Sequence, residues 1–337
     1  MYFITNIIFL IKYIYNWVNI RSSSKKYKKQ FLYIFLFATN FCNAQNSITK
    51  KDTSSFFSTS LSPNKTKIKL LAFGEGSVYA IGNIGLYNLW YKNYSTGKFH
   101  FFNDNKEWLY MDKLGHSTIS FYFGWQGYNL MRWAGVSENK SLLYGGCLGF
   151  VFLSTVEIMD GFSNGWGFSN GDIVANAAGT IAFIAQQKYF HQPVFKLKNS
   201  YHDTQYSQIR PNLLGGSLPQ RMLKDYNGQT YWLTGNLQYI TQNKKIPNWL
   251  CFAFGYGIDG FVGATSNVFI SKGATFDYSN IKRHNQFYVS LDVDLSKINT
   301  KYKMLNTVIH AFGLFKIPFP AIEFNKVDKM KLHPIYF

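Results

Sequence analysis

The chain has 337 residues and a formal net charge of +18, with 47% hydrophobic and 19% aromatic residues. This length is enough for one large domain or two modest ones, and the apolar content excludes an intrinsically disordered chain. The basic residues form no zinc-finger, RNP-type or helix-turn-helix pattern, so we expect no nucleic acid partner.

Residues 1–44 are interpreted as a signal region. Basic residues at 25–29 precede a short apolar run at 31–38, and the letters NAQ predict cleavage after Ala44. Lipidation at Cys42 is not expected, because Phe41 stands where a small residue is needed. Residues 1–20 are either an extra membrane helix or an over-long start, and we favour the second.

Residues 45–65 are rich in Ser, Thr and Lys and predict a flexible tether. Residues 66–194 predict a helical bundle. After an apolar helical segment at 67–94 and a loop at 95–108, helices are expected at 112–133, 137–159 and 169–189. Each is about 31 Å long at 1.5 Å per residue, which matches the hydrocarbon core of a membrane. However, polar side chains interrupt each helix, so membrane-embedded and soluble bundles both remain open.

Residues 195–337 predict a mixed α/β C-terminal region. Asn227-Gly228 lies between Tyr-rich flanks and predicts a β-hairpin. Residues 287–295 alternate between apolar and polar and predict a half-buried strand, and residues 318–324 are expected to be extended. The predicted fold class is therefore mainly α: an antiparallel helical bundle with a smaller C-terminal part that contains a β-hairpin.

Polar residues gather at the helix ends that an antiparallel bundle places together. Asp112 and His116 open the first helix, Glu157 and Asp160 close the second, and Asp172 and Asn176 open the third. Their i,i+4 and i,i+3 spacings put each pair on one helix face. The candidate site consists of catalytic candidates and of further members of a polar cluster. The catalytic candidates are His116, Glu157, Asp172 and Asn176, and the further members are Asp112, Lys113 and Asp160.

Helix capping is an alternative explanation for two of these acids. Asp112 is suited to an N-cap, and Asp172 stands at the third position of a capping box that begins at Ser169. Glu157 and Asp160 have no such explanation, because they lie at a helix C-terminus, where the helix dipole disfavours anions. We therefore expect Glu157 to face a partner such as His116.

Four segments of the chain resemble a known family: DKLGH, EIMDGFSNGWGFSNGDIVANAAG, KDYNGQTYWL and SLDVDLSKI with KIPFPAIEF. They are similar to uncharacterised bacterial envelope proteins, the predicted periplasmic lipoproteins of the YfiM kind, over about residues 66–337. The pattern D-K-x-x-H, E and D-x-x-A-N-x-x-G also resembles VanZ-like membrane proteins. Neither resemblance implies a biochemical activity.

The favoured function is that of an exported cell-envelope protein, structural or lipid-interacting, which is periplasmic and membrane-associated. Its expected partner is membrane lipid or envelope glycan. The alternative is a membrane-proximal hydrolase or transferase that acts on a lipid-linked or glycan substrate, with His116 as base and Glu157 or Asp172 as its acid partner. No cofactor is expected. If a metal binds, one His with several carboxylates suits Mg²⁺, Mn²⁺ or Ca²⁺ better than structural zinc.

Overall fold

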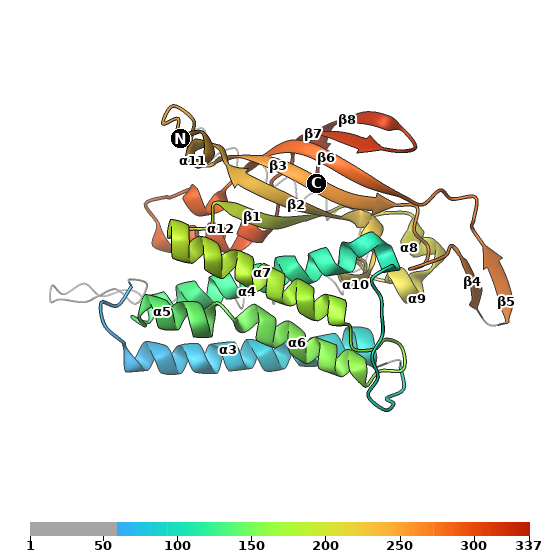
Figure 1. Ribbon diagram of the computed structural model, residues 1–337, viewed down its shortest axis with the longest axis horizontal. Helices are drawn as coiled ribbons and strands as arrows, with labels where there is room; N and C mark the ends of the chain where they lie inside the picture. Colours follow the sequence, from blue (N-terminus) through green and yellow to red (C-terminus); the bar gives the residue numbers. More distant parts are fainter. Residues whose placement is uncertain (1–58, 93, 272) are drawn as a thin grey trace, which may run out of the picture. The chain divides into compact units, whose positions relative to one another are not determined.

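A computed structural model describes residues 59–92, 94–271 and 273–337. The expected signal region, Cys42 and most of the expected tether lie outside these residues. Residues Ser54–Phe337 form one compact unit. Its helices come first along the chain and its large sheet follows (Figure 1).

The helical part contains the three expected helices, at nearly the expected positions. Its elements are α3 (Lys65–Leu86), η1 (Tyr87–Tyr91), η2 (Glu107–Tyr110), α4 (Met111–Trp133), α5 (Glu138–Lys140), η3 (Ser141–Gly145), α6 (Leu148–Gly161) and α7 (Asn170–Phe190). The second expected helix is divided into α5, the π-helical turn η3 and α6. By length and composition, the stretch Glu138–Gly161 is the one described helix that could cross a membrane, and 33% of its apolar window is buried.

Small residues let α4, α6 and α7 approach one another closely. A Cβ atom at Gly179 of α7 would lie 2.0 Å from the carbonyl oxygen of Ser117, and one at Gly149 of α6 would lie 2.3 Å from that of Ser120. Neither position has room for a larger residue. This close packing sets the separation of the helix ends that carry the polar residues.

The C-terminal part is dominated by a sheet, and this overturns the predicted mainly α fold class. About 48% of the described residues are helical and 23% lie in strands. Six antiparallel strands follow the order β1-β2-β3-β6-β7-β8, and β4-β5 form a separate pair. The strands are β1 (Phe195–Tyr201), β2 (Gln229–Asn236), β3 (Leu250–Asp259), β4 (Val268–Ser271), β5 (Ala274–Asp277), β6 (His284–Val293), β7 (Phe319–Asn325) and β8 (Lys329–Tyr336).

Short helices connect these strands. They are α8 (Tyr206–Ile209), α9 (Pro211–Leu214), α10 (Leu218–Lys224), η4 (Tyr226–Gly228), α11 (Leu237–Thr241), η5 (Leu295–Lys297), α12 (Lys303–Ala311) and η6 (Phe312–Leu314). The two expected extended segments are strands β6 and β7.

The hairpin predicted at Asn227-Gly228 is wrong. These residues form the 3₁₀ turn η4, which joins helix α10 to strand β2. The reason is a local network of hydrogen bonds around Asn227. Asp225 accepts hydrogen bonds from the backbone and side-chain amides of Asn227, and the side chain of Asn227 also binds the backbone of Phe261. The amide side chain therefore anchors a distant loop and does not turn the chain back on itself.

One face of the sheet is buried and combines ion pairs with an apolar cluster around Trp232 and Tyr288. Lys198 of β1 forms an ion pair with Asp292 of β6 at 2.6 Å, and the two side chains are 1% and 0% exposed. Lys196 pairs in the same way with Asp294, at 2.5 Å. Buried charges need such partners, since an unpaired charge in an apolar interior costs several kcal/mol.

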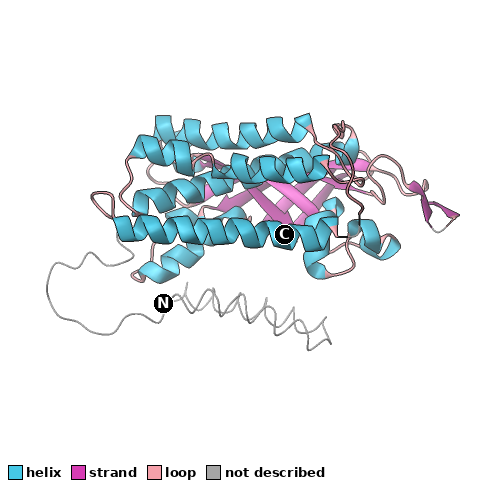
Figure 2. Ribbon diagram, turned by 90° about the horizontal axis from the view of Figure 1, so that it is seen from below, coloured by secondary structure: helices cyan, strands magenta, loops and turns pink. Residues whose placement is uncertain are grey.

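The helices meet the sheet at its β1 and β2 side. Leu197 of β1 packs against the core of α4 and α7, which includes Phe121 and Phe183. Seen from below, the helices lie in front of the strands (Figure 2). These contacts lie along the middle of α4, from Phe121 to Tyr128.

Candidate functional site

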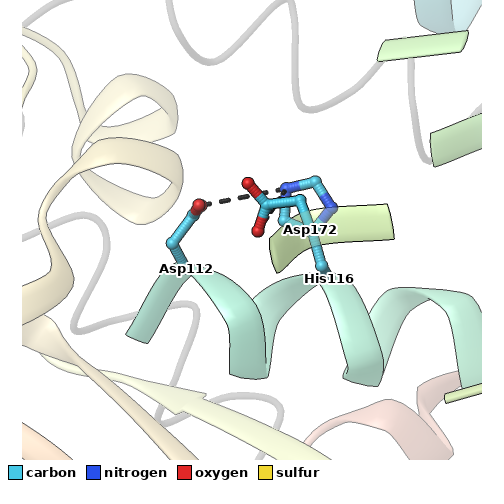
Figure 3. A group of neighbouring side chains, drawn as sticks. All are labelled: Asp112, His116 and Asp172. Atoms are coloured by element: carbon cyan, nitrogen blue, oxygen red, sulfur yellow. Dashed lines mark ion pairs between the residues drawn. The ribbon is translucent and has the colours of Figure 1, made fainter. Parts of the chain in front are cut away.

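The structure brings the seven predicted polar residues together where α4 begins, α6 ends and α7 begins. Asp112, Lys113 and His116 come from the first turns of α4, and Figure 3 shows Asp112, His116 and Asp172 facing one another. We refer to these seven residues together with Asp104 as the polar cluster. The catalytic roles assigned to them from the sequence remain predictions.

His116 is at the centre of the polar cluster. Its Nδ1 atom lies 3.0 Å from the amide oxygen of Asn176, and because that oxygen can only accept, Nδ1 carries a proton. The other ring nitrogen, Nε2, faces three carboxylates: Glu157 at 3.6 Å, Asp112 at 3.9 Å and Asp172 at 4.0 Å. All three distances are longer than a hydrogen bond.

Lys113 neutralises part of the negative charge. Its ammonium lies 2.5 Å from Asp104, 2.9 Å from Asp172 and 3.3 Å from Asp112. Five carboxylates, those of Asp104, Asp112, Glu157, Asp160 and Asp172, therefore face two cationic side chains, which leaves three negative charges uncompensated when all are ionised.

Glu157 ties the end of α6 to the start of α7. It is 1% exposed, and its carboxylate accepts a hydrogen bond from the backbone amide of Ser169 at 3.1 Å. The Ser169 hydroxyl accepts from the Asp172 amide and donates to Asp104 at 2.7 Å. Ser169 is therefore the N-cap of α7, as the capping-box pattern suggests.

The capping explanation does not hold for Asp112. The N-cap of α4 is Tyr110, which has a positive φ of 68° and makes no side-chain capping bond. Asp112 lies inside the helix, and its carboxylate accepts a hydrogen bond from the Tyr226 hydroxyl at 2.5 Å.

Sequence reasoning missed one member of the cluster, Asp104, and two tyrosines that contact it. Asp104 and Tyr226 belong to distant connecting segments, and Tyr91, the last residue of η1, donates to Asp160 at 2.8 Å. The only available signal was an acid in the 95–108 loop and a tyrosine next to Asn227, and neither has a helical spacing to mark it.

Burial and crowding of charge displace the pKa values of the cluster. Burial raises the pKa of Glu157 to about 8 and those of Asp160 and Asp172 to about 7. Burial alone would lower the pKa of His116, but the neighbouring carboxylates, with Asp112 first, outweigh it and raise that pKa. Burial likewise opposes ionisation of Asp112, yet His116 and Lys113 lower its pKa.

Two buried polar atoms of the cluster have no hydrogen-bond partner among the described residues. They are Oδ1 of Asp172, which is 3% exposed, and Nδ2 of Asn176, which is 0% exposed. Asp112, His116 and Asp172 each offer one ligand atom, and these atoms lie within 4.8 Å of one another. The donor set thus resembles that of a divalent cation site.

Residues 100–187 match the family described as "Predicted periplasmic lipoprotein (DUF2279)", and this confirms the resemblance to uncharacterised periplasmic lipoproteins for that segment. The matched segment contains every residue of the polar cluster. The match supports an exported, periplasmic location. The resemblance to VanZ-like proteins is not supported. No curated protein and no solved structure matches the chain.

Proposed function

We propose that this protein is an exported envelope protein that contacts membrane lipid through the apolar face of its sheet. The observation that carries the proposal is a row of exposed apolar side chains at paired positions on five strands. The row consists of Leu233, Phe254, Val289, Ile322 and Leu332, which are 44%, 55%, 44%, 37% and 69% exposed. With strands about 4.8 Å apart, the row extends for about 19 Å.

The contrast with the opposite face supports lipid as the partner. Successive residues of a strand point to opposite faces. Here the buried positions carry the Lys198–Asp292 ion pair beside aromatic side chains such as Trp232 and Tyr288, while the exposed positions of the row are apolar. A sheet that borders water normally shows the reverse pattern. Polar groups inside and apolar groups outside are typical of strands that border lipid.

Helix α3, which lies on the far side of the helical layer from the sheet (Figure 1), carries a second exposed apolar surface. Phe73, Val78, Ile81 and Ile84 of α3 are each more than 60% exposed. Exposed apolar area of this extent marks an interaction surface in soluble proteins, and its transfer out of water contributes about 25 cal/mol per Å². Residues 1–44 hold six basic residues and no acid, so the chain from Gln45 onward has a net charge of +12 (18 − 6), which favours anionic lipid headgroups.

Within this proposal the polar cluster has a structural role. Its hydrogen bonds and ion pairs join α4, α6, α7 and the loop at Asp104, and Glu157 and Asp172 are almost fully buried. A polar network of this kind fixes one arrangement of helices, because any other arrangement leaves buried charges unpaired.

Vesicle flotation tests the proposal. The chain from Gln45 onward, mixed with vesicles of phosphatidylethanolamine and phosphatidylglycerol, should float with the lipid. The double variant Val289→Asp, Ile322→Asp should float at least about tenfold less, since a charge in a lipid-facing position costs up to about 2–4 kcal/mol. The control is Ile270→Asp, which changes an even more exposed apolar residue (75%) on the separate β4-β5 pair and should float like the wild type.

Unchanged flotation of the double variant would contradict lipid contact through this row. Retention on purified peptidoglycan without any vesicle binding would favour envelope glycan as the partner.

A second candidate function, the membrane-proximal hydrolase or transferase, is favoured by one observation. The pKa of Asp112 is lowered while that of Glu157 is raised to about 8, and carboxyl groups separated in this way can serve as a base and an acid at the same pH. The test is turnover of a fluorescent glycolipid by the purified chain. Activity should disappear in Glu157→Gln, and absence of turnover by the wild type on lipid-linked and glycan substrates would argue against this function.

A further inference from the structure

The ligand atoms around His116 point to a property of the polar cluster that does not depend on lipid contact. Because Nδ1 holds the proton that Asn176 accepts, the neutral imidazole directs the lone pair of Nε2 toward Asp112, Asp172 and Glu157. An acceptor that faces three acceptors is unfavourable. Either a proton or a cation must stand between them.

The distances favour a cation. Two ligand atoms that each lie about 2.1–2.4 Å from one ion are about 3–4.8 Å apart, depending on the angle between them. The ligand atoms of Asp112, His116 and Asp172 lie within 4.8 Å of one another, and Nε2 lies 3.9 and 4.0 Å from the two carboxylates. An imidazolium held only by its carboxylates would be expected to close to hydrogen-bond distance.

The same molecule provides the comparison. In the sheet, Nε2 of His333 lies 2.7 Å from a carboxylate oxygen of Glu323 and is hydrogen-bonded to it. No gap for an ion exists there. Around His116 the nitrogen makes no hydrogen bond within the described part of the chain, and the gap is common to three oxygens.

The unpartnered atoms are a second, separate observation. Oδ1 of Asp172 is buried without a hydrogen bond, and it lies 2.9 Å from the Lys113 ammonium and 4.0 Å from Nε2 of His116, so it faces the gap as a possible ligand. The buried Nδ2 of Asn176 also lacks an acceptor, and a water molecule bound to an ion would provide one. The uncompensated negative charge of the cluster points the same way.

We propose that Asp112, His116 and Asp172 bind one divalent cation, with Glu157 as the nearest further oxygen ligand. Carboxylates suit Mg²⁺, Ca²⁺ and Mn²⁺, and a nitrogen ligand in the set favours Mn²⁺ among these three. The ion joins α4 to α7 and reduces the negative charge of the cluster.

Titration of the full chain with Mn²⁺, followed by the electron paramagnetic resonance signal of the free ion, tests the site. One Mn²⁺ should bind per chain. His116→Gln and Asp172→Asn should each weaken binding by more than about tenfold, as expected for loss of a ligand. His333→Gln, which removes an imidazole from the hydrogen-bonded pair in the sheet, should bind Mn²⁺ like the wild type.

A second measurement needs no variant. In the wild-type chain labelled with ¹⁵N-histidine, Mn²⁺ should broaden the ring resonances of one histidine strongly and leave the other six, including that of His333, sharp until the first equivalent is exceeded. Saturable binding that survives both His116→Gln and Asp172→Asn would overturn the proposal. So would the absence of saturable Mn²⁺ binding by the wild type.

Discussion

Replacing Asp112 by Asn should lower the pKa of His116 more than replacing Glu157 by Gln. The sequence alone favours the opposite order, because Glu157 has no capping role and Asp112 is suited to one. The structure places both carboxylates at similar distances from Nε2, at 3.9 and 3.6 Å. The difference lies in their ionisation, since the pKa of Asp112 is lowered and that of Glu157 is raised to about 8.

The magnitude follows from Coulomb's law. Two unit charges 3.9 Å apart interact by about 4 kcal/mol at an effective dielectric constant of 20 and by about 1 kcal/mol in water. The Asp112 and His116 side chains are 26% and 15% exposed, so their attraction lies between these limits. About 2 kcal/mol corresponds to more than a tenfold loss of proton affinity. At pH 7 a carboxyl with a pKa of about 8 is roughly one-tenth ionised, so Glu157→Gln removes little charge.

The assay is an NMR titration of the His116 ring in the wild type and both variants, with EDTA present so that no cation competes. Assignment comes from the resonance that is missing in His116→Gln. Asn at position 112 still accepts the Tyr226 hydrogen bond, so the variant changes charge more than structure. Asp203→Asn, which removes a carboxylate paired with Arg221, is the control and should leave the titration unchanged. A larger pKa change in Glu157→Gln than in Asp112→Asn would refute this reasoning.

Three further predictions concern stability. Gly179→Ala should destabilise the chain by about 1–3 kcal/mol in chemical denaturation, because its Cβ would lie 2.0 Å from the Ser117 carbonyl oxygen. The control is Gly74→Ala in α3, where nothing lies within 4 Å, and it should be neutral or stabilise the chain by up to about 1 kcal/mol. Equal effects of the two substitutions would contradict the close packing. Lys198→Met should lower the free energy of unfolding by about 3–5 kcal/mol, because the buried Asp292 carboxylate loses its ion-pair partner. Adding Asp292→Leu should restore most of this free energy. If the double variant instead loses the sum of the two single effects, the ion pair is not the cause. In EDTA, the melting temperature should fall from pH 5 to pH 8. Glu157, Asp160 and Asp172 have pKa values of about 7 to 8 in the folded state against reference values of 3.8 to 4.5, so the folded state holds more protons across this window and loses stability as the pH rises. A melting temperature that rises over the same range would refute this sign.

The helices and the heart of the polar cluster could be predicted from the sequence because both depend on local spacing. The pairs Asp112–His116 and Asp172–Asn176 mark one face of a helix each, and short connections bring the ends of successive helices together. Asp104 and Tyr226 could not be predicted, since their positions are set by contacts between distant parts of the chain. The hairpin prediction failed for the same reason, because Asn227 is held by Phe261 and not by its neighbours alone.

The sheet was missed because its strands contradict the rule that apolar residues face inward. Strand β1 has Lys196 and Lys198 at its buried positions, and β3 has Gly255 and Gly257 within it, which weakens any strand signal. The partners that stabilise these residues, Asp292 and Asp294, come almost 100 residues later. Sequence windows contain no information about such pairs, whereas the helices are specified within a few turns.

The buried polar face of the sheet and the polar cluster between the helices have one physical feature in common. In both, charged groups are buried next to groups of opposite charge, although the polar cluster keeps more carboxylates than cations, and large apolar side chains such as Phe254 and Val289 remain on the outer face of the sheet. In water this arrangement would cost free energy twice, once for the buried charges and once for the exposed apolar surface. In contact with lipid the second cost becomes a gain, and internal pairing becomes the only way to satisfy the charged groups. The proposed lipid contact would remove the cost of the exposed apolar row, and the proposed cation at His116 would separately lower the cost of the excess carboxylates in the polar cluster.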